Sequence, residues 1–129
     1  MTDRISILIW ERKFDLPVEY DRYSDEKITK EQEEALAEFI RHPDWIYNSK
    51  ASIEEYCKVQ VMEDERNEKK DNIFSYVKPD YVYVKRNRRN EKEKPKVALM
   101  CKYKYDPEHG LAVVFSEGSV TVGIQDIIL

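Results

Sequence analysis

The chain has 129 residues, and we expect it to fold as a single domain over 1–129. Its composition, 41% hydrophobic and 12% aromatic, is too apolar for a disordered protein, although 37% of the residues are charged. The net charge of −4 disfavours a protein that coats nucleic acid or an anionic membrane. No apolar stretch approaches the roughly 20 residues of a membrane span, and the N-terminus does not resemble a signal peptide, so we expect a cytoplasmic protein.

Two alternating patterns near the N-terminus predict a pair of strands. Apolar residues alternate from Ile5 to Ile9, and the alternation resumes from Phe14 to Tyr20. Leu8 and Trp10 lie on the opposite face of the first strand, which suggests that both of its faces are covered and that it is central. Pro17 has no backbone N–H to donate, so we expect the second strand at an edge of the sheet.

Two helices are predicted next. Thr29 and Gln32 have the spacing of a capping box, which predicts a helix from Thr29 to about Arg41. Pro43 suits the first turn of a second helix, which we expect to continue to about Arg66. Apolar residues recur along this second helix at spacings near three, four and seven. They are Trp45, Ile46, Ile53, Tyr56, Cys57 and Val61.

The middle of the chain is rich in charge. The mixed-sign run 63–71 predicts a solvated helix end or loop. A short strand is expected at Tyr81–Val84. The segment Lys85 to Lys96 follows, with seven basic residues and two glutamates, and we interpret it as a basic flexible loop.

The C-terminal third predicts an antiparallel meander. Alternation from Val97 to Tyr105 indicates a long, half-buried strand. A turn at 106–110 leads to a second strand at Leu111–Phe115, and a turn at 116–119 leads to a third at Val120–Ile124. The fold class is therefore α+β, with a mostly antiparallel sheet of about five to six strands. The elements follow the order β-β-α-α-β-β-β-β, and we expect the two helices to pack on one face of the sheet.

The sharpest candidate for chemistry is the turn at 106–110. Asp106, Glu108 and His109 bring two carboxylates and an imidazole together, as a general base and its orienting acid would require. Asp-Pro at the start and glycine at the end are ordinary turn chemistry, so a structural turn is the favoured interpretation. No serine or cysteine stands in a nucleophile motif, and the three glycines all lie in the meander, which excludes a P-loop or a Rossmann turn.

The basic loop is the one segment that resembles a nucleic-acid contact. Its cations at 85–89 could neutralise phosphates, and Tyr81 and Tyr83 could stack on bases. A solvated loop that keeps strand edges from aggregating is the favoured interpretation. Cys57 and Cys101 are interpreted as buried thiols in a reducing compartment, and zinc is disfavoured because only two histidines accompany them. We expect no cofactor and no metal, although a metal site assembled from the many carboxylates stays open.

The C-terminal segment resembles a known family. The residues that carry the resemblance are Tyr103 to Phe115, Gly118, Val120, Val122-Gly123 and the ending Gln125 to Leu129, together with Trp10 to Leu16 near the N-terminus. They resemble a family of small bacterial proteins described only as a domain of unknown function. The resemblance implies a bacterial cytoplasmic α+β protein of a kind often met near polymorphic-toxin and immunity genes. It carries over no catalytic residue.

The leading hypothesis is therefore a non-enzymatic protein-binding module, in particular an immunity-type protein that occludes a toxin domain. Nine tyrosines and a segregation of charge along the chain suit a protein interface. The candidate contact residues are Tyr81, Tyr83, Tyr103, Tyr105, Glu108 and His109. The alternatives are a small hydrolase that uses Asp106, Glu108 and His109, and a nucleic-acid accessory protein that uses the basic loop.

Overall fold

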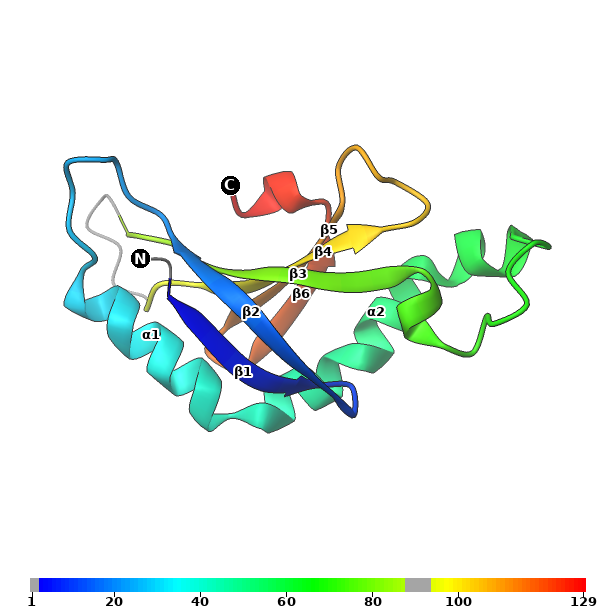
Figure 1. Ribbon diagram of the computed structural model, residues 1–129, viewed down its shortest axis with the longest axis horizontal. Coiled ribbons are helices and arrows are strands. Elements are labelled where there is room, and N and C mark those ends of the chain that lie inside the picture. Colours follow the sequence, from blue (N-terminus) through cyan, green and yellow to red (C-terminus); the bar gives the residue numbers. More distant parts are fainter. Residues whose placement is uncertain (1–2, 88–93) are drawn as a thin grey trace.

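The computed structural model describes residues 3–87 and 94–129 (Figure 1). The fold class and the order of elements agree with the prediction. The elements are β1 (Arg4–Ile9), β2 (Arg12–Tyr20), α1 (Lys30–Arg41), α2 (Pro43–Glu63), β3 (Val77–Val84), β4 (Val97–Tyr103), β5 (Leu111–Ser116) and β6 (Ser119–Gly123). Two short 3-10 helices, η1 (Ile73–Ser75) and η2 (Gln125–Ile127), complete the described chain.

One six-stranded sheet has its strands in chain order from β1 to β6. Four of the five neighbouring pairs are antiparallel, and β2 pairs with β3 in parallel over only three positions, from Val18 opposite Val82 to Tyr20 opposite Val84. The sheet is therefore mixed but mostly antiparallel. The parallel pair joins an N-terminal hairpin to a C-terminal meander.

The predicted positions of the first two strands are wrong. β1 is an edge strand, and β2 is internal, between β1 and β3. Leu8, which suggested a covered second face for β1, is 59% exposed. The amide of Val18 points toward β1, so the nitrogen of the preceding residue, Pro17, faces the β3 side of the strand. Pairing with β3 begins only at Val18, so no hydrogen bond is lost and Pro17 is tolerated inside the sheet.

A two-residue turn joins β1 to β2. Trp10 has a φ of 46° and Glu11 a φ of 73°, a left-handed backbone at both positions that matches the twist of a tight hairpin. Trp10 remains buried, and its indole nitrogen donates to Oγ of Ser49 in α2 at 3.3 Å. This hydrogen bond fixes the hairpin against the second helix.

The capping box predicted at Thr29 is confirmed. Oγ1 of Thr29 accepts from the backbone N–H of Gln32 at 3.1 Å, and Oε1 of Gln32 accepts from the backbone N–H of Thr29 at 3.0 Å. Gln32 is fully buried, and its amide nitrogen also donates to the carbonyls of Asp21 and Val84. One side chain thus joins the helix start to the end of β2 and the end of β3.

The second helix begins at Pro43 as predicted, but it ends at Glu63 rather than near Arg66. Asp64 leaves the helical conformation, and its N–H closes the last turn by donating to the carbonyls of Gln60 and Val61. The run after the helix was predicted to be solvated, yet Asn67 within it is buried and hydrogen-bonds Ser75.

Both helices lie on one face of the sheet, below it in Figure 1, and the main core fills the space between. A smaller apolar cluster lies on the opposite face, formed by Ala98, Met100, Ala112, Val114 and Ile128. β4 is therefore buried on both faces, which corrects the half-buried strand predicted from its alternation. β3 begins at Val77, earlier than predicted, with its register interrupted between Pro79 and Tyr81.

Candidate functional site

The structure divides the four tyrosines of the predicted binding site between the two faces of the sheet. Tyr81 and Tyr83 lie on the face that bears the smaller apolar cluster, where they face Met100 and Ala98 of β4. Tyr103 and Tyr105 belong to the helix-covered face. One flat partner surface cannot contact all four tyrosines.

Tyr103 is part of the core. Its side chain is 4% exposed, and its hydroxyl donates to Oε1 of Gln60 at 3.3 Å. Burial and a hydrogen bond with the Cys57 side chain raise the pKa of Tyr103 well above its ordinary value. Both cysteines are buried free thiols, as expected, and burial raises the pKa of each. The side chains of Tyr103 and the two cysteines are therefore part of the core and are not accessible to a partner.

Tyr105 lies at the margin of an open cleft beyond the end of α2. Its hydroxyl donates to Oδ2 of Asp64 at 2.7 Å, and Nζ of Lys104 lies 3.1 Å from the same oxygen. These donors, the tyrosine first, lower the pKa of Asp64 to about 2. The cleft has a volume of about 670 Å³. Its lining residues are Gln60, Glu63, Asp64, Glu65, Arg66, Lys104 and Tyr105.

The turn at 106–110 forms an ordered loop at the surface. Nδ1 of His109 lies 3.0 Å from Oδ1 of Asp106, and this contact raises the pKa of His109. Gly110 has a φ of 63°, and the amide of Gln125 and the carbonyl of Cys101 lie so close that no Cβ would fit. Glu108 and His109 are exposed. The His–Asp contact has the arrangement of a base and its orienter, but the same Asp106 oxygen also accepts from the backbone N–H of His109 at 3.3 Å and so serves the turn.

The described flanks of the basic loop are neutralised by carboxylates of the same chain. Lys85 lies 3.5 Å from Asp21, and Arg86 lies 3.4 Å from Glu26. Lys94 forms a 2.7 Å contact with Glu38 that raises the pKa of the lysine. These flanking cations are therefore engaged by carboxylates within the chain. The centre of the loop, 88–93, lies outside the described residues.

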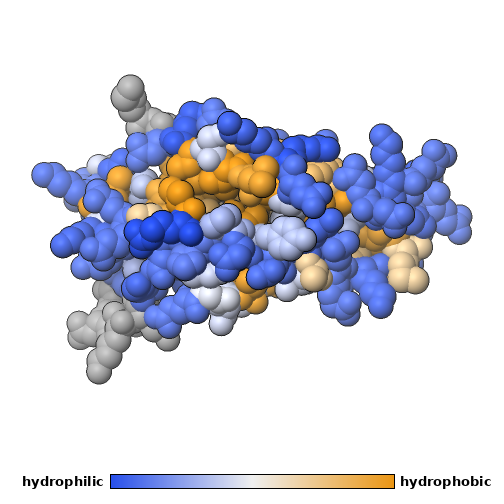
Figure 2. Space-filling model, turned by 90° about the horizontal axis from the view of Figure 1, so that it is seen from below, coloured by the Kyte–Doolittle hydropathy of each residue, from blue (hydrophilic) through white to orange (hydrophobic). Residues whose placement is uncertain are grey.

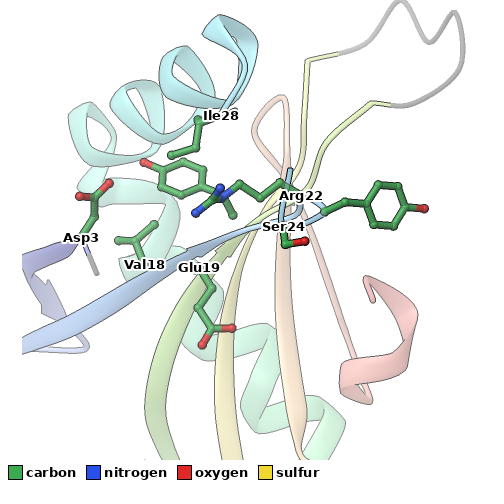
Figure 3. A pocket seen from close by; sticks show the side chains of 8 residues that line it. Asp3, Val18, Glu19, Arg22, Ser24 and Ile28 are labelled. Atoms are coloured by element: carbon green, nitrogen blue, oxygen red, sulfur yellow. The ribbon is translucent and has the colours of Figure 1, made fainter. Parts of the chain in front are cut away.

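A second cleft, of about 480 Å³, lies where β2 ends (Figure 3). Asp3, Arg22 and Ile28 point into it, whereas Glu19 points away. Tyr20 also lines this cleft, and burial raises its pKa. Within 3–87 and 94–129, no group of three or more His, Cys, Asp and Glu side chains is placed to hold a metal ion.

The outer face of α2 is the feature that the sequence interpretation missed. It exposes four large hydrophobic side chains, whereas every other described helix or strand exposes at most one of that kind. They are Tyr47 (64% exposed), Tyr56 (40%), Val59 (64%) and Met62 (67%). We call Tyr47, Tyr56, Val59 and Met62 the α2 surface. Tyr56 was assigned to the apolar stripe of this helix, yet it is 40% exposed. The signal was present in the sequence, because Tyr47, Val59 and Met62 lie outside that stripe and give the helix apolar positions on both sides.

Comparisons with known proteins identify a family and nothing more specific. A family model described as "Domain of unknown function (DUF6985)" matches residues 1–129. No curated protein and no solved structure matches the chain. None of the helices in the described part of the chain is long and apolar enough to cross a membrane.

Proposed function

Because the chain belongs to the family described as a domain of unknown function (DUF6985), we propose its function from the geometry of its surfaces: it is a protein-binding module. The observation that carries the proposal is the α2 surface, a set of large apolar side chains that the fold itself leaves uncovered. Surface apolar residues are ordinary when scattered singly, but their concentration on one element is typical of an interaction site.

The surroundings of the α2 surface suit a charged partner. Glu55 and Glu63 are exposed on the same helix, beside the apolar side chains. A central apolar patch with a polar rim is the usual anatomy of a protein interface. The rim also carries cations, because Lys58 is exposed beside Val59 and Nζ of Lys70 donates to the carbonyl of Met62, so a partner with charges of both signs would complement it.

The specific form of the proposal is an immunity-type protein that blocks a toxin domain by covering its active surface. The resemblance of residues 103–129 to small bacterial proteins met near toxin genes supports this form. Occlusion needs only a complementary surface and no catalytic group on the immunity protein. A bacterial origin and a cytoplasmic location belong to the same proposal.

The test begins with capture of the partner by the tagged protein from its source organism, followed by titration calorimetry with the purified partner. The double variant V59E/M62E should raise the dissociation constant at least about tenfold, because it places two charges in the apolar centre of the interface. T121E is the matched control, since Thr121 is exposed on β6, on the sheet face away from the helices. Equal affinity for V59E/M62E and T121E would remove the α2 surface from the proposal.

The immunity-type form has its own readout. Expression of the captured partner alone should arrest growth of a heterologous host, and co-expression of this protein should restore it. V59E/M62E should fail to restore growth, whereas T121E should succeed. A partner that is harmless on its own would leave a binding module without an immunity role.

A further inference from the structure

β1 is an edge strand without the usual protection against pairing. Natural edge strands carry proline, a central charge, a bulge or a covering loop. β1 has no proline, and its register with β2 is regular throughout. Between Arg4 and Glu11 the sequence is Ile-Ser-Ile-Leu-Ile-Trp, with no charged residue. In the part of the chain that the structure describes, β2 is the only strand paired with β1.

The hydrogen bonds of the first hairpin determine which amides of β1 face outward. The N–H of Val18 donates to the carbonyl of Asp3 at 2.7 Å, which makes Asp3 and Val18 a hydrogen-bonded pair. Such pairs alternate along an antiparallel ladder, so the backbone groups of alternate residues point to opposite edges. The residues whose N–H and C=O groups face the open edge are therefore Arg4, Ser6 and Leu8.

The side chains next to this edge are apolar on the helix side. Ile5 and Ile7 pack against the main core but are only partly buried. Figure 2 views the molecule from below, the side on which the helices lie in Figure 1, and shows apolar side chains gathered in a patch there. A strand added to the edge would extend the sheet and cover part of Ile5 and Ile7.

We infer that the occupant of this edge is β1 of a second copy, which pairs antiparallel about a two-fold axis through Ser6. A closed dimer requires a two-fold axis, and two copies of one strand related by it run antiparallel. In this register Ser6 faces the Ser6 of the second copy, and Arg4 faces its Leu8. All three outward residues then form hydrogen-bonded pairs, and Ile5 of each copy packs beside Ile7 of the other.

The same geometry selects this register over its two neighbours, whose axes pass through Ile5 and Ile7 and also join outward amides. An axis through Ile5 would pair Arg4 with the Ser6 of the second copy, but it would place Leu8 opposite residue 2, outside the described residues. An axis through Ile7 would place Asp3 opposite the Glu11 of the second copy. It would also require Trp10 to continue the ladder, and Trp10 has turned out of the strand with a φ of 46°. The register centred on Ser6 places no like charges opposite each other and ends before the turn.

A cysteine scan tests the register directly. In S6C the two Cα atoms should lie about 5.5 Å apart, a separation that a disulfide spans, so mild oxidation should give mostly cross-linked dimer. L8C is the matched control, because Leu8 is exposed on the same face but should lie roughly 13 Å from its counterpart. The native Cys57 and Cys101 are fully buried and should not cross-link. Equal cross-linking of S6C and L8C, or none of S6C, would overturn the register.

Charge complementation tests the dimer itself by light scattering after size exclusion. The unmodified protein should be a dimer at micromolar concentration, and S6K and S6E alone should each weaken it at least about tenfold, because like charges then face each other. A one-to-one mixture of S6K and S6E should restore dimers. T121K, on the other edge strand, should remain dimeric. A monomeric unmodified protein, an unrestored mixture, or a monomeric T121K would overturn the proposal.

Discussion

The hydroxyl of Tyr105 donates a 2.7 Å hydrogen bond to Oδ2 of Asp64, and this contact joins the segment after β4 to the residue that caps α2. Lys104 contacts the same oxygen, and the backbone N–H of Arg66 donates to the other. Three donors therefore surround a carboxylate whose side chain is 14% exposed. The arrangement links the helix end to the sheet at the margin of the larger cleft.

The first prediction concerns acid sensitivity at Asp64. Its donors lower the folded-state pKa from 3.8 to about 2, so its contribution to stability is complete above the unfolded pKa and is lost as pH falls toward 2. D64N should unfold at a lower urea concentration than the unmodified protein at pH 7. The difference should close between about pH 4 and pH 2. D25N, at an exposed carboxylate, is the control, and a D64N difference that persists unchanged at pH 2 contradicts the account.

The second prediction concerns His109, whose pKa is raised above 6.5, chiefly by its contact with Asp106. A raised folded pKa stabilises the protein below the unfolded pKa, and the contribution is lost as pH rises through the folded value. An NMR titration should show the imidazole pKa falling toward 6.5 in D106N. No change in D106N would mean that the Nδ1–carboxylate contact is absent in solution.

The third prediction compares Gln32 with Thr29. Q32A should lower the free energy of unfolding by about 2–3 kcal/mol, because it removes the side-chain donor to the carbonyl of Asp21, one of the two donors to the carbonyl of Val84, and the acceptor for the N–H of Thr29. T29A removes the helix cap alone and should cost about 1 kcal/mol. Urea denaturation measures both. A smaller loss for Q32A than for T29A would show that the capping role dominates.

The fourth prediction concerns the two hairpin turns. Glu11 has a φ of 73°, so E11G should raise the free energy of unfolding by about 0.5–1 kcal/mol. G118A is the converse, because Gly118 has a φ of 86° and a Cβ there would meet nothing nearer than the Trp45 indole nitrogen at 4.0 Å. It should lower stability by about 1 kcal/mol through the backbone alone. Urea denaturation of both variants shows whether the signs are opposite.

The parts of the fold that depend on neighbouring residues could be predicted from the sequence. The capping box at Thr29, the proline start of α2 and the turn at 116–119 each depend on contacts within a few residues. The position of β1 was not predictable in this way, because the neighbours of a strand are set by pairing across the whole chain. Leu8 is apolar, yet it is exposed, so hydrophobicity alone did not reveal its side of the sheet.

The candidate site was harder to predict for a related reason. Alternation places Tyr103 and Tyr105 on one face of the strand predicted over 97–105, but it does not say which face is covered. Burial on both faces depends on Ile128, which returns from the chain end to the smaller cluster. The α2 surface was missed because Val59 and Met62 lie outside the buried stripe, and an apolar residue in a helix is read first as core.

The short parallel pairing between β2 and β3 has a consequence for how the chain folds. The hairpin and the meander can each form from contacts close in sequence, whereas Val18 meets Val82 only after a long loop that contains both helices has closed. The loop must close before those contacts contribute, so we expect the pairing of β2 with β3 to be the late, rate-limiting event of folding. Amides of Val82 and Val84 should therefore gain protection from hydrogen exchange after those of β4 and β5.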